Sequence, residues 1–249
     1  MERVLDIPVS GNFRDLGGYA MDGGTVRRRT LFRADALSEL TDEGRDRLGE
    51  LGMRTVVDLR DPLERELDPD LVDGLGIATI ERPLIEDRIE MQTVRGLRGL
   101  YRELRELCGD RLAEAVGVLA GPGALPAVVH CSAGKDRTGI VCALALSAIG
   151  VSAEDIAADY ALSSKVLVGP IRERVRRRAL AAGMTEQAVA VAMDSPPELM
   201  LETLDYIVAE HGSAAGYLKS NGLSSERLES LRLALLDAGI PGITLPDSV

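Results

Sequence analysis

The chain has 249 residues, of which 45% are hydrophobic and 28% are charged, and its formal net charge is −11 at pH 7. This composition is ordinary for a globular protein with a sizeable core, which must be largely aliphatic because only 3% of the residues are aromatic. The acidic balance, without interleaved aromatic and basic residues, excludes an extended nucleic-acid interface. Any bound anion must therefore be held by a local site.

The N-terminal residues, MERVLDIPVSGN, contain no apolar segment of the kind found in signal peptides. No part of the sequence approaches the roughly 18 apolar residues that a membrane-spanning helix needs. We therefore expect a cytoplasmic protein without stable membrane insertion.

The first half of the chain alternates predicted strands and helices. A turn-rich loop is expected at 11–19, a strand or hairpin at 25–34, a helix capped by Thr41 up to about 51, strands at 53–60, 76–84 and 125–130, and two helices between 88 and 120. This alternation predicts an α/β fold with a central, mostly parallel sheet flanked by helices. The loop after 125–130 would lie at the carboxyl edge of the sheet, where such folds bind ligands.

The second half is predicted to be helical, with helices at 138–149, 153–163, 167–182, 185–193, 196–211 and 225–238. Ser195 is the expected cap of the helix at 196–211, and two prolines fit its first turn. No repeat or linker divides the chain, so we expect one domain over 1–249 with a lid-like helical insertion at about 163–211. Its basic stretch, IRERVRRRAL at 171–180, is expected to cover the site or face an acidic lipid surface, the alternative being a solvated helix face.

The three cysteines, Cys108, Cys131 and Cys142, lack CxxC spacing, and the chain has only two histidines. Neither a disulfide framework nor a zinc cluster is expected from such a set. Cys108 and Cys142 fit small buried or capping residues. Cys131 differs because it directly follows a predicted strand.

The segment PAVVHCSAGKDRTGI at 126–140 joins that strand to a predicted helix. Six successive backbone N–H groups, from Ser132 to Arg137, precede the helix, and Gly134 allows the chain to curl so that these donors converge. The helix N-terminus adds positive potential, and the Arg137 guanidinium can bind two oxygens of a phosphate. The predicted phosphate-binding loop comprises Ser132, Ala133, Gly134, Lys135, Asp136 and Arg137.

Cys131 lies at the edge of this predicted loop. The same N–H groups and helix dipole favour its thiolate, which would be a nucleophile at neutral pH. Attack on phosphorus would form a phosphocysteine that water then hydrolyses, with no metal required. Thr138 is expected to hydrogen-bond the departing sulfur, and His130 to fix the loop through its ring nitrogens.

These residues carry a resemblance to a known family. HCSAGKDRTG resembles the H-C-x5-R-[ST] loop of the protein tyrosine phosphatase superfamily. GNFRDLGGY at 11–19, LFRADAL at 31–37 and VVDLR at 56–60 resemble the bacterial group with tyrosine, lipid or triple specificity, which is represented in mycobacteria and Listeria. The resemblance implies a phosphatase of this fold without metal or cofactor, with Cys131 as nucleophile and Arg137 as transition-state clamp. It also allows secretion without a recognisable signal peptide.

The general acid needs separate treatment because the chain has no tryptophan and hence no W-P-D loop. The resemblance favours Asp136, inside the phosphate loop, followed by Asp58 and then Asp87. Lys135 is expected to contact an anionic substrate or a second phosphate, or else to remain solvated beside the loop. For GNFRDLGGY, Gly17 and Gly18 would form a turn, and Arg14 would pair with Asp15 or another acidic neighbour.

The predicted function is therefore a metal-independent phosphatase that acts on phosphotyrosine in proteins, and also on phosphoserine, phosphothreonine or phosphoinositides. Its predicted partners are a phosphoprotein or a phosphoinositide. Two alternatives from other classes remain: a rhodanese-like sulfurtransferase, which also uses a cysteine in a curled loop, and a non-catalytic phosphate-binding module. The spacing of Arg137 and Thr138 from the cysteine favours phosphate chemistry.

Overall fold

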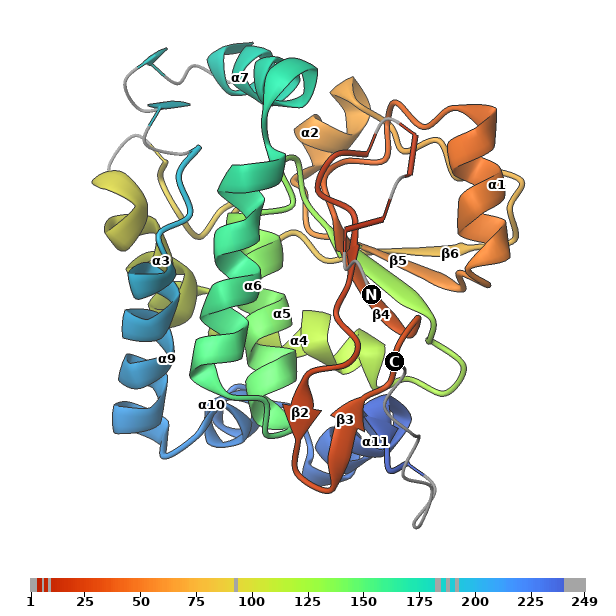
Figure 1. Cartoon of the computed structure of the whole chain (residues 1–249). Coiled ribbons are helices and arrows are strands. Elements are labelled where there is room, and N and C mark those ends of the chain that lie inside the picture. The colour runs from red at the N-terminus through yellow and green to blue at the C-terminus, as the bar shows by residue number, and fades with distance from the viewer. Residues whose placement is uncertain are drawn as a thin grey trace, which may run out of the picture.

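A five-stranded sheet forms the centre of the computed structural model, which describes residues 4–5, 7–8, 10–91, 94–181, 185–186, 189–190 and 193–239 (Figure 1). Its strands, in spatial order, are β1 (Arg14–Asp15), β4 (Leu31–Ala34), β7 (Ala127–His130), β5 (Thr55–Asp58) and β6 (Ala78–Glu81). The last four are parallel, and β1 is antiparallel to β4. The predicted α/β fold with a mostly parallel sheet is thus confirmed.

Ten helices with given bounds surround this sheet in the described part of the chain. They are α1 (Asp42–Glu50), α2 (Pro62–Leu67), α3 (Gly96–Leu107), α4 (Gly109–Leu119), α5 (Asp136–Ala148), α6 (Ala153–Val166), α7 (Gly169–Ala181), α9 (Pro197–His211), α10 (Ala214–Ser220) and α11 (Ser225–Leu235). A second, small sheet joins β2 (Ala20–Met21), β3 (Gly24–Val26) and β8 (Leu236–Asp237). It brings a segment near the C-terminus beside the N-terminal hairpin.

The two faces of the central sheet bury different side chains because neighbouring residues of a strand point to opposite faces. Val56 and Val128 pack with Leu48 of α1 on one face. Val57 and Val129 face the larger core, to which α3 to α6 and α9 to α11 contribute. Helix α5 is buried along most of its length, so the helix that follows the loop at 131–135 also lies at the centre of the core.

The helix capped by Thr41 is confirmed, since the Thr41 hydroxyl accepts a hydrogen bond from the Gly44 N–H at 3.2 Å. Helix α5 begins at Asp136 rather than at Thr138. The predicted helix at 225–238 is too long, because Leu236 and Asp237 leave α11 and pair with β3.

Two short helices, α2 and α10, were not predicted. Helix α2 has no buried residue, so its sequence lacks the apolar residues at helical spacing that would have predicted it. Pro62 occupies the first turn of this helix. The helix predicted at 185–193, and with it part of the insertion at 163–211, lies partly outside the described residues.

The cap predicted for the helix at 196–211 is wrong. Pro196 is the residue that precedes the first turn of α9. The Ser195 hydroxyl instead accepts a hydrogen bond from the Ser164 N–H at 2.9 Å and donates one to the Ala161 carbonyl at 3.3 Å. Ser195 therefore attaches the start of α9 to the end of α6.

The parallel register brings the carboxyl ends of four strands together at one edge of the sheet. Ala34, His130, Asp58 and Glu81 are aligned across β4, β7, β5 and β6 at their carboxyl ends. Cys131 directly follows this row, so the loop at 131–135 lies where an α/β fold binds ligands. Among the described residues, no helix is both long and apolar enough to cross a lipid bilayer.

We predict that Leu144→Ala, in the fully buried part of α5, lowers the free energy of unfolding by about 2–5 kcal/mol because it leaves a cavity in the larger core. Leu233→Ala is the matched control, since Leu233 is 55% exposed on α11 and its loss should change stability by no more than about 0.5 kcal/mol. Urea denaturation of the two variants measures both values. Equal losses would contradict the assignment of α5 to the core.

Candidate active site

The loop after β7 is shaped by a close approach to β4. Gly134 has a φ of +64°, and a Cβ atom at this position would lie 2.1 Å from the Ala34 carbonyl oxygen. Both constraints require glycine, because another side chain would meet backbone atoms that cannot yield. The loop is therefore pressed against the end of β4, and α5 starts directly after it.

Arg137 is held by a carboxylate that sequence reasoning missed. Its Nη1 and Nη2 atoms donate to Oε2 and Oε1 of Glu64 at 2.5 and 2.8 Å, and the Ser132 hydroxyl donates to Oε1 at 2.5 Å. Burial opposes the charge on Glu64, but hydrogen bonds from Arg137 and Ser132 hold its pKa at about 2. The guanidinium is thereby fixed in orientation before any substrate arrives.

The signal for Glu64 was present in the sequence as a capping box. Glu64 is the third residue of α2, and its Oε2 also accepts a hydrogen bond from the Asp61 N–H at 2.9 Å. The D-P-L-E pattern at 61–64 has the spacing of such a box. The Glu64 carboxylate therefore both caps the start of α2 and orients Arg137.

The surroundings of the three cysteines shift their pKa values in different directions. Burial favours the neutral thiol of Cys131, but the positive charge of Arg137 and the donor groups of Thr138 outweigh it, so that the Cys131 pKa is lowered. Burial instead raises the pKa of Cys142 to about 12 and that of Cys108 to about 11. Only at Cys131, among these three, does the surrounding structure favour the thiolate.

His130 belongs to a buried network behind the loop. Its Nδ1 lies 3.3 Å from the Cys131 carbonyl oxygen, and its Nε2 lies 3.0 Å from Oδ2 of Asp70. Burial opposes the imidazolium, but the charge of Asp70 raises the His130 pKa. Arg60 pairs with Asp70 at 2.8 Å and with Asp58 at 2.7 Å, so its guanidinium compensates the charge of both carboxylates.

The three candidate acids occupy different environments. Asp136 is 17% exposed at the start of α5. The Asp58 side chain is 1% exposed and is engaged by Arg60 through both of its oxygens. Asp87 is 73% exposed and pairs with Arg111 at 2.6 Å, a hydrogen bond that lowers its pKa.

Asp136 makes two contacts through one oxygen. The Lys135 ammonium lies 3.0 Å from its Oδ1, and the Tyr160 hydroxyl donates to the same atom at 3.4 Å. Lys135 is fully buried and also donates to the Asp194 carbonyl at 2.5 Å, so the solvated alternative for this side chain is wrong. The second carboxylate oxygen, Oδ2, is the one that these contacts leave available.

Arg14 of GNFRDLGGY does not pair with Asp15. Its Nε donates to Oδ1 of Asp159, on α6, at 3.0 Å, and both side chains are buried. Asp15 instead accepts hydrogen bonds from the backbone N–H groups of Gly17 at 2.8 Å and Arg29 at 3.0 Å. The motif therefore joins the N-terminal segment to α6.

Comparison with known proteins agrees with this geometry. A family model described as "Tyrosine phosphatase family" matches residues 5–237.

The chain belongs to this family.

Its relatives include a triple specificity protein phosphatase, PtpB of Mycobacterium tuberculosis, which is 30% identical over 94% of this chain and 99% of the relative. A tyrosine-protein phosphatase of Nostoc commune is 29% identical over 85% of this chain and 78% of the relative. A crystal structure of TpbA from P. aeruginosa is similar with a TM-score of 0.32 and 18% identity, over 70% of this chain and 94% of that chain. The predicted family and phosphatase class are thus confirmed.

In this phosphatase, the basic helix α7 does not present all its arginines to solvent. Arg174 pairs with Asp35 at 2.7 Å and with Glu39 at 2.8 Å. Arg178 donates to Asp68 and to the Ser38 hydroxyl, each at 2.8 Å. These contacts attach α7 to the segments that follow β4 and α2, so the expectation of a fully solvated face is wrong for this part of the helix.

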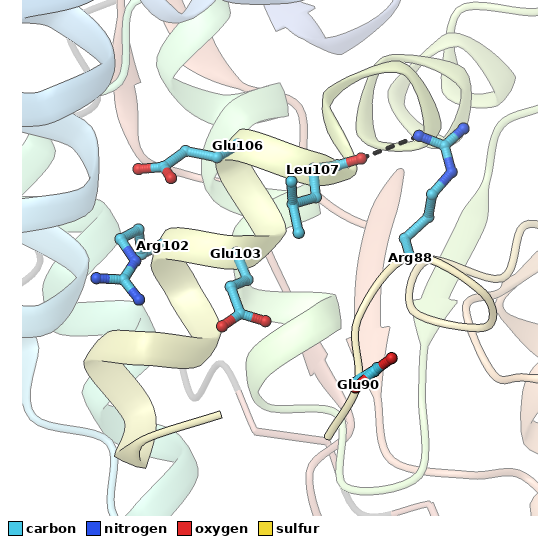
Figure 2. Close-up of a pocket in the computed structure, with 6 residues that line it drawn as sticks. All are labelled: Arg88, Glu90, Arg102, Glu103, Glu106 and Leu107. Atoms are coloured by element: carbon cyan, nitrogen blue, oxygen red, sulfur yellow. Dashed lines mark hydrogen bonds between the residues drawn. The ribbon is translucent and has the colours of Figure 1, made fainter. Parts of the chain in front are cut away.

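Two cavities lie near the helices that flank the loop. One, of about 560 Å³, lies beside α3 and is lined by charges of both signs and by Leu107, whose carbonyl accepts a hydrogen bond from Arg88 at 3.0 Å (Figure 2). The other, of about 630 Å³, includes Asp194, the residue to which Lys135 donates. No residue of the loop at 131–137 lines either cavity, and the second is connected to the loop only through the contact between Lys135 and Asp194.

We predict that alkylation of Cys131 by iodoacetamide persists below the ordinary thiol range and declines only as the pH falls through its lowered pKa. Thr138→Ala removes a donor that favours the thiolate, so the alkylation profile should move to higher pH. Mass spectrometry of the labelled peptides follows Cys131 against Cys142 and Cys108 over the same pH range. An unchanged profile in Thr138→Ala would remove Thr138 from the site.

Proposed function

We propose that the phosphatase hydrolyses phosphotyrosine monoesters in proteins through a phosphocysteine intermediate formed on Cys131, and that phosphoserine, phosphothreonine or phosphoinositides are further substrates. The observation that carries this proposal is the position of Cys131, its pKa lowered, in a loop beside an arginine that Glu64 has already oriented. The similarity to the M. tuberculosis relative, a triple specificity protein phosphatase, supports the wider substrate range.

In the first step, the Cys131 thiolate attacks phosphorus and the bond from phosphorus to the leaving oxygen breaks. Loop N–H groups and the Arg137 guanidinium bind the non-bridging oxygens, where negative charge is held in the transition state. The proton that the leaving oxygen requires comes from the carboxyl group of Asp136. Because its Oδ1 is engaged by Lys135 and Tyr160, we assign Oδ2 as the donor.

In the second step, water attacks the phosphocysteine and the bond from sulfur to phosphorus breaks. The Asp136 carboxylate, left ionised by the first step, accepts a proton from that water. Sulfur leaves as a thiolate, which Thr138 and the positive charge of Arg137 stabilise. The enzyme returns to its starting state with inorganic phosphate as product.

Asp136 is preferred to the other two candidates on grounds of environment. Protonation of Asp58 would cost its bidentate pairing with the buried Arg60, so we assign Asp58 a supporting role behind the loop, together with His130. Asp87 is 73% exposed and pairs with Arg111 of α4, and none of the contacts described for it joins it to the loop. A sulfurtransferase or a non-catalytic module is not favoured, because the family is that of tyrosine phosphatases.

We further propose that the phosphatase is one domain in which the insertion at about 163–211 is a lid. Two attachments support this interpretation. Arg174 of α7 pairs with Asp35, which follows β4 at the carboxyl edge of the sheet, and Lys135 of the loop donates to the Asp194 carbonyl. The lid would therefore be held closed partly by contacts to the phosphate loop itself.

We predict that Cys131→Ser lowers kcat/KM for an aryl phosphate by at least about 10³-fold, because the hydroxyl is not ionised at neutral pH. The measurement is phosphate release at pH 6–7 with a chelator present in every reaction. Inorganic phosphate should still bind to the variant, since the loop N–H groups and Arg137 are unchanged. Activity that survives the substitution, or that the chelator abolishes, would contradict the mechanism.

We predict that Asp136→Asn lowers kcat on phenyl phosphate by about 10²–10⁴-fold, because the phenolate then leaves without a proton. The loss should be much smaller on p-nitrophenyl phosphate, whose leaving group is stable as an anion. Asp87→Asn serves as the control and should leave both rates unchanged. An equal loss on the two substrates would exclude Asp136 as the acid.

A further inference from the structure

The carbonyl groups of the phosphate loop are bound from behind by two buried side chains. Nδ2 of Asn12 donates to the carbonyls of Ala133 and Gly134 at 2.9 and 3.0 Å. Nη2 of Arg33 donates to the carbonyls of Gly134 and Lys135 at 2.9 and 3.2 Å. Asn12 and Arg33 are each 1% exposed. Three successive loop carbonyls are therefore tied to the interior of the protein.

This arrangement decides where the loop N–H groups point. In a trans peptide unit the C=O and the following N–H point in opposite directions. Carbonyls of Ala133, Gly134 and Lys135 that face Asn12 and Arg33 therefore direct the next three N–H groups to the opposite side. That side is where successive N–H groups form an anion-binding concavity.

The same cluster contains a buried surplus of positive charge. Oδ1 of Asp159 lies 3.0 Å from Nε of Arg14, and its Oδ2 lies 2.8 Å from Nη1 of Arg33. None of these three side chains is more than 2% exposed. Two guanidinium groups thus share one carboxylate, and the other hydrogen-bond partners of Asp159 and Arg14, such as the Ser163 hydroxyl, are neutral. An uncompensated charge in the interior is costly unless another group of opposite charge balances it.

We propose that Asn12 and Arg33 are positioning residues of this phosphatase: they hold the loop carbonyls away from the substrate, and the surplus charge behind the loop attracts the phosphoryl group. The proposal rests on the proposed function, in that the balancing anion is the substrate's phosphate. It gives a role to the GNFRDLGGY, LFRADAL and DYALSS segments, which supply Asn12 and Arg14, Arg33, and Asp159 respectively.

The test measures binding of inorganic phosphate in a Cys131→Ser background, where no turnover interferes. Asn12→Ala removes no charge, but it removes two hydrogen bonds to the loop and one that Asn12 Oδ1 accepts from Arg14. We expect the Kd for phosphate, from titration calorimetry or thermal stabilisation, to rise about tenfold. Arg33→Met also removes the surplus charge while leaving Arg14 paired with Asp159, so its Kd should rise further. In the Cys131 background, kcat/KM should fall in the same order.

Asp15→Asn is the matched control. Asp15 is a buried polar residue of β1, three positions from Asn12 in the sequence, but it binds the backbone of Gly17 and Arg29 rather than the loop. This variant should lose stability while its phosphate Kd stays within about twofold of the parent. If Asn12 is a positioning residue, Asn12→Ala should instead weaken phosphate binding more than it lowers stability.

The proposal is overturned if Asn12→Ala binds phosphate as tightly as its parent, or if Asp15→Asn weakens phosphate binding as much as Asn12→Ala does. If Arg33→Met does not fold, the phosphate Kd of Asn12→Ala still tests the proposal. Failure of the proposed function looks different. Wild-type protein that releases no phosphate from any aryl phosphate, while Asn12→Ala still weakens phosphate binding, would refute the phosphatase mechanism and support the positioning role.

Discussion

In the proposed reaction, a thiolate and a phosphate dianion must lie side by side in a site with little water. Most of the structure around residues 131–137 serves to offset the repulsion between these two negative charges. Like charges at such a distance repel strongly in a medium of low dielectric constant. Positive charge and N–H dipoles therefore have to come from several directions at once. Arg137 supplies the first, and the loop and the N-terminus of α5 supply the second. The depth of α5 in the core keeps these donors in place.

Each source of positive charge is in turn held by a carboxylate from a distant part of the chain. Glu64 orients Arg137, Asp159 joins Arg14 to Arg33, and Asp70 faces His130. These carboxylates come from α2, α6 and the loop after α2, elements that share little apolar contact with one another. Helix α2 is the clearest case, because it has no buried side chain and its Glu64 carboxylate binds both Ser132 and Arg137. Its position is thus coupled to that of the loop.

The sequence predicted the parts of the site that local rules govern. A strand, a curled loop, a cysteine, an arginine and a helix occur together within residues 126–140, and the alternation of elements indicated the parallel sheet. Glu64 and Asp159 were missed as partners because ion pairs between distant segments leave no periodic pattern in the sequence. The cap role of Ser195 was wrong for a related reason. A serine before two prolines fits a local motif, but here its hydroxyl meets the end of α6, and that tertiary contact prevails.

The link between Arg14 and Asp159 spans 145 positions of the chain. Local segments form early in folding, whereas contacts between such distant residues must await the closure of a long loop of chain. The loop carbonyls acquire both buried donors only when the segment that carries Asn12 has docked beside β4, and the two guanidinium groups acquire their shared carboxylate only when α6 has docked. A chain with an intact sheet but an undocked α6 would lack the carboxylate that holds Arg14 and Arg33 behind the loop. We therefore expect catalytic activity to be acquired late in folding, after most of the secondary structure.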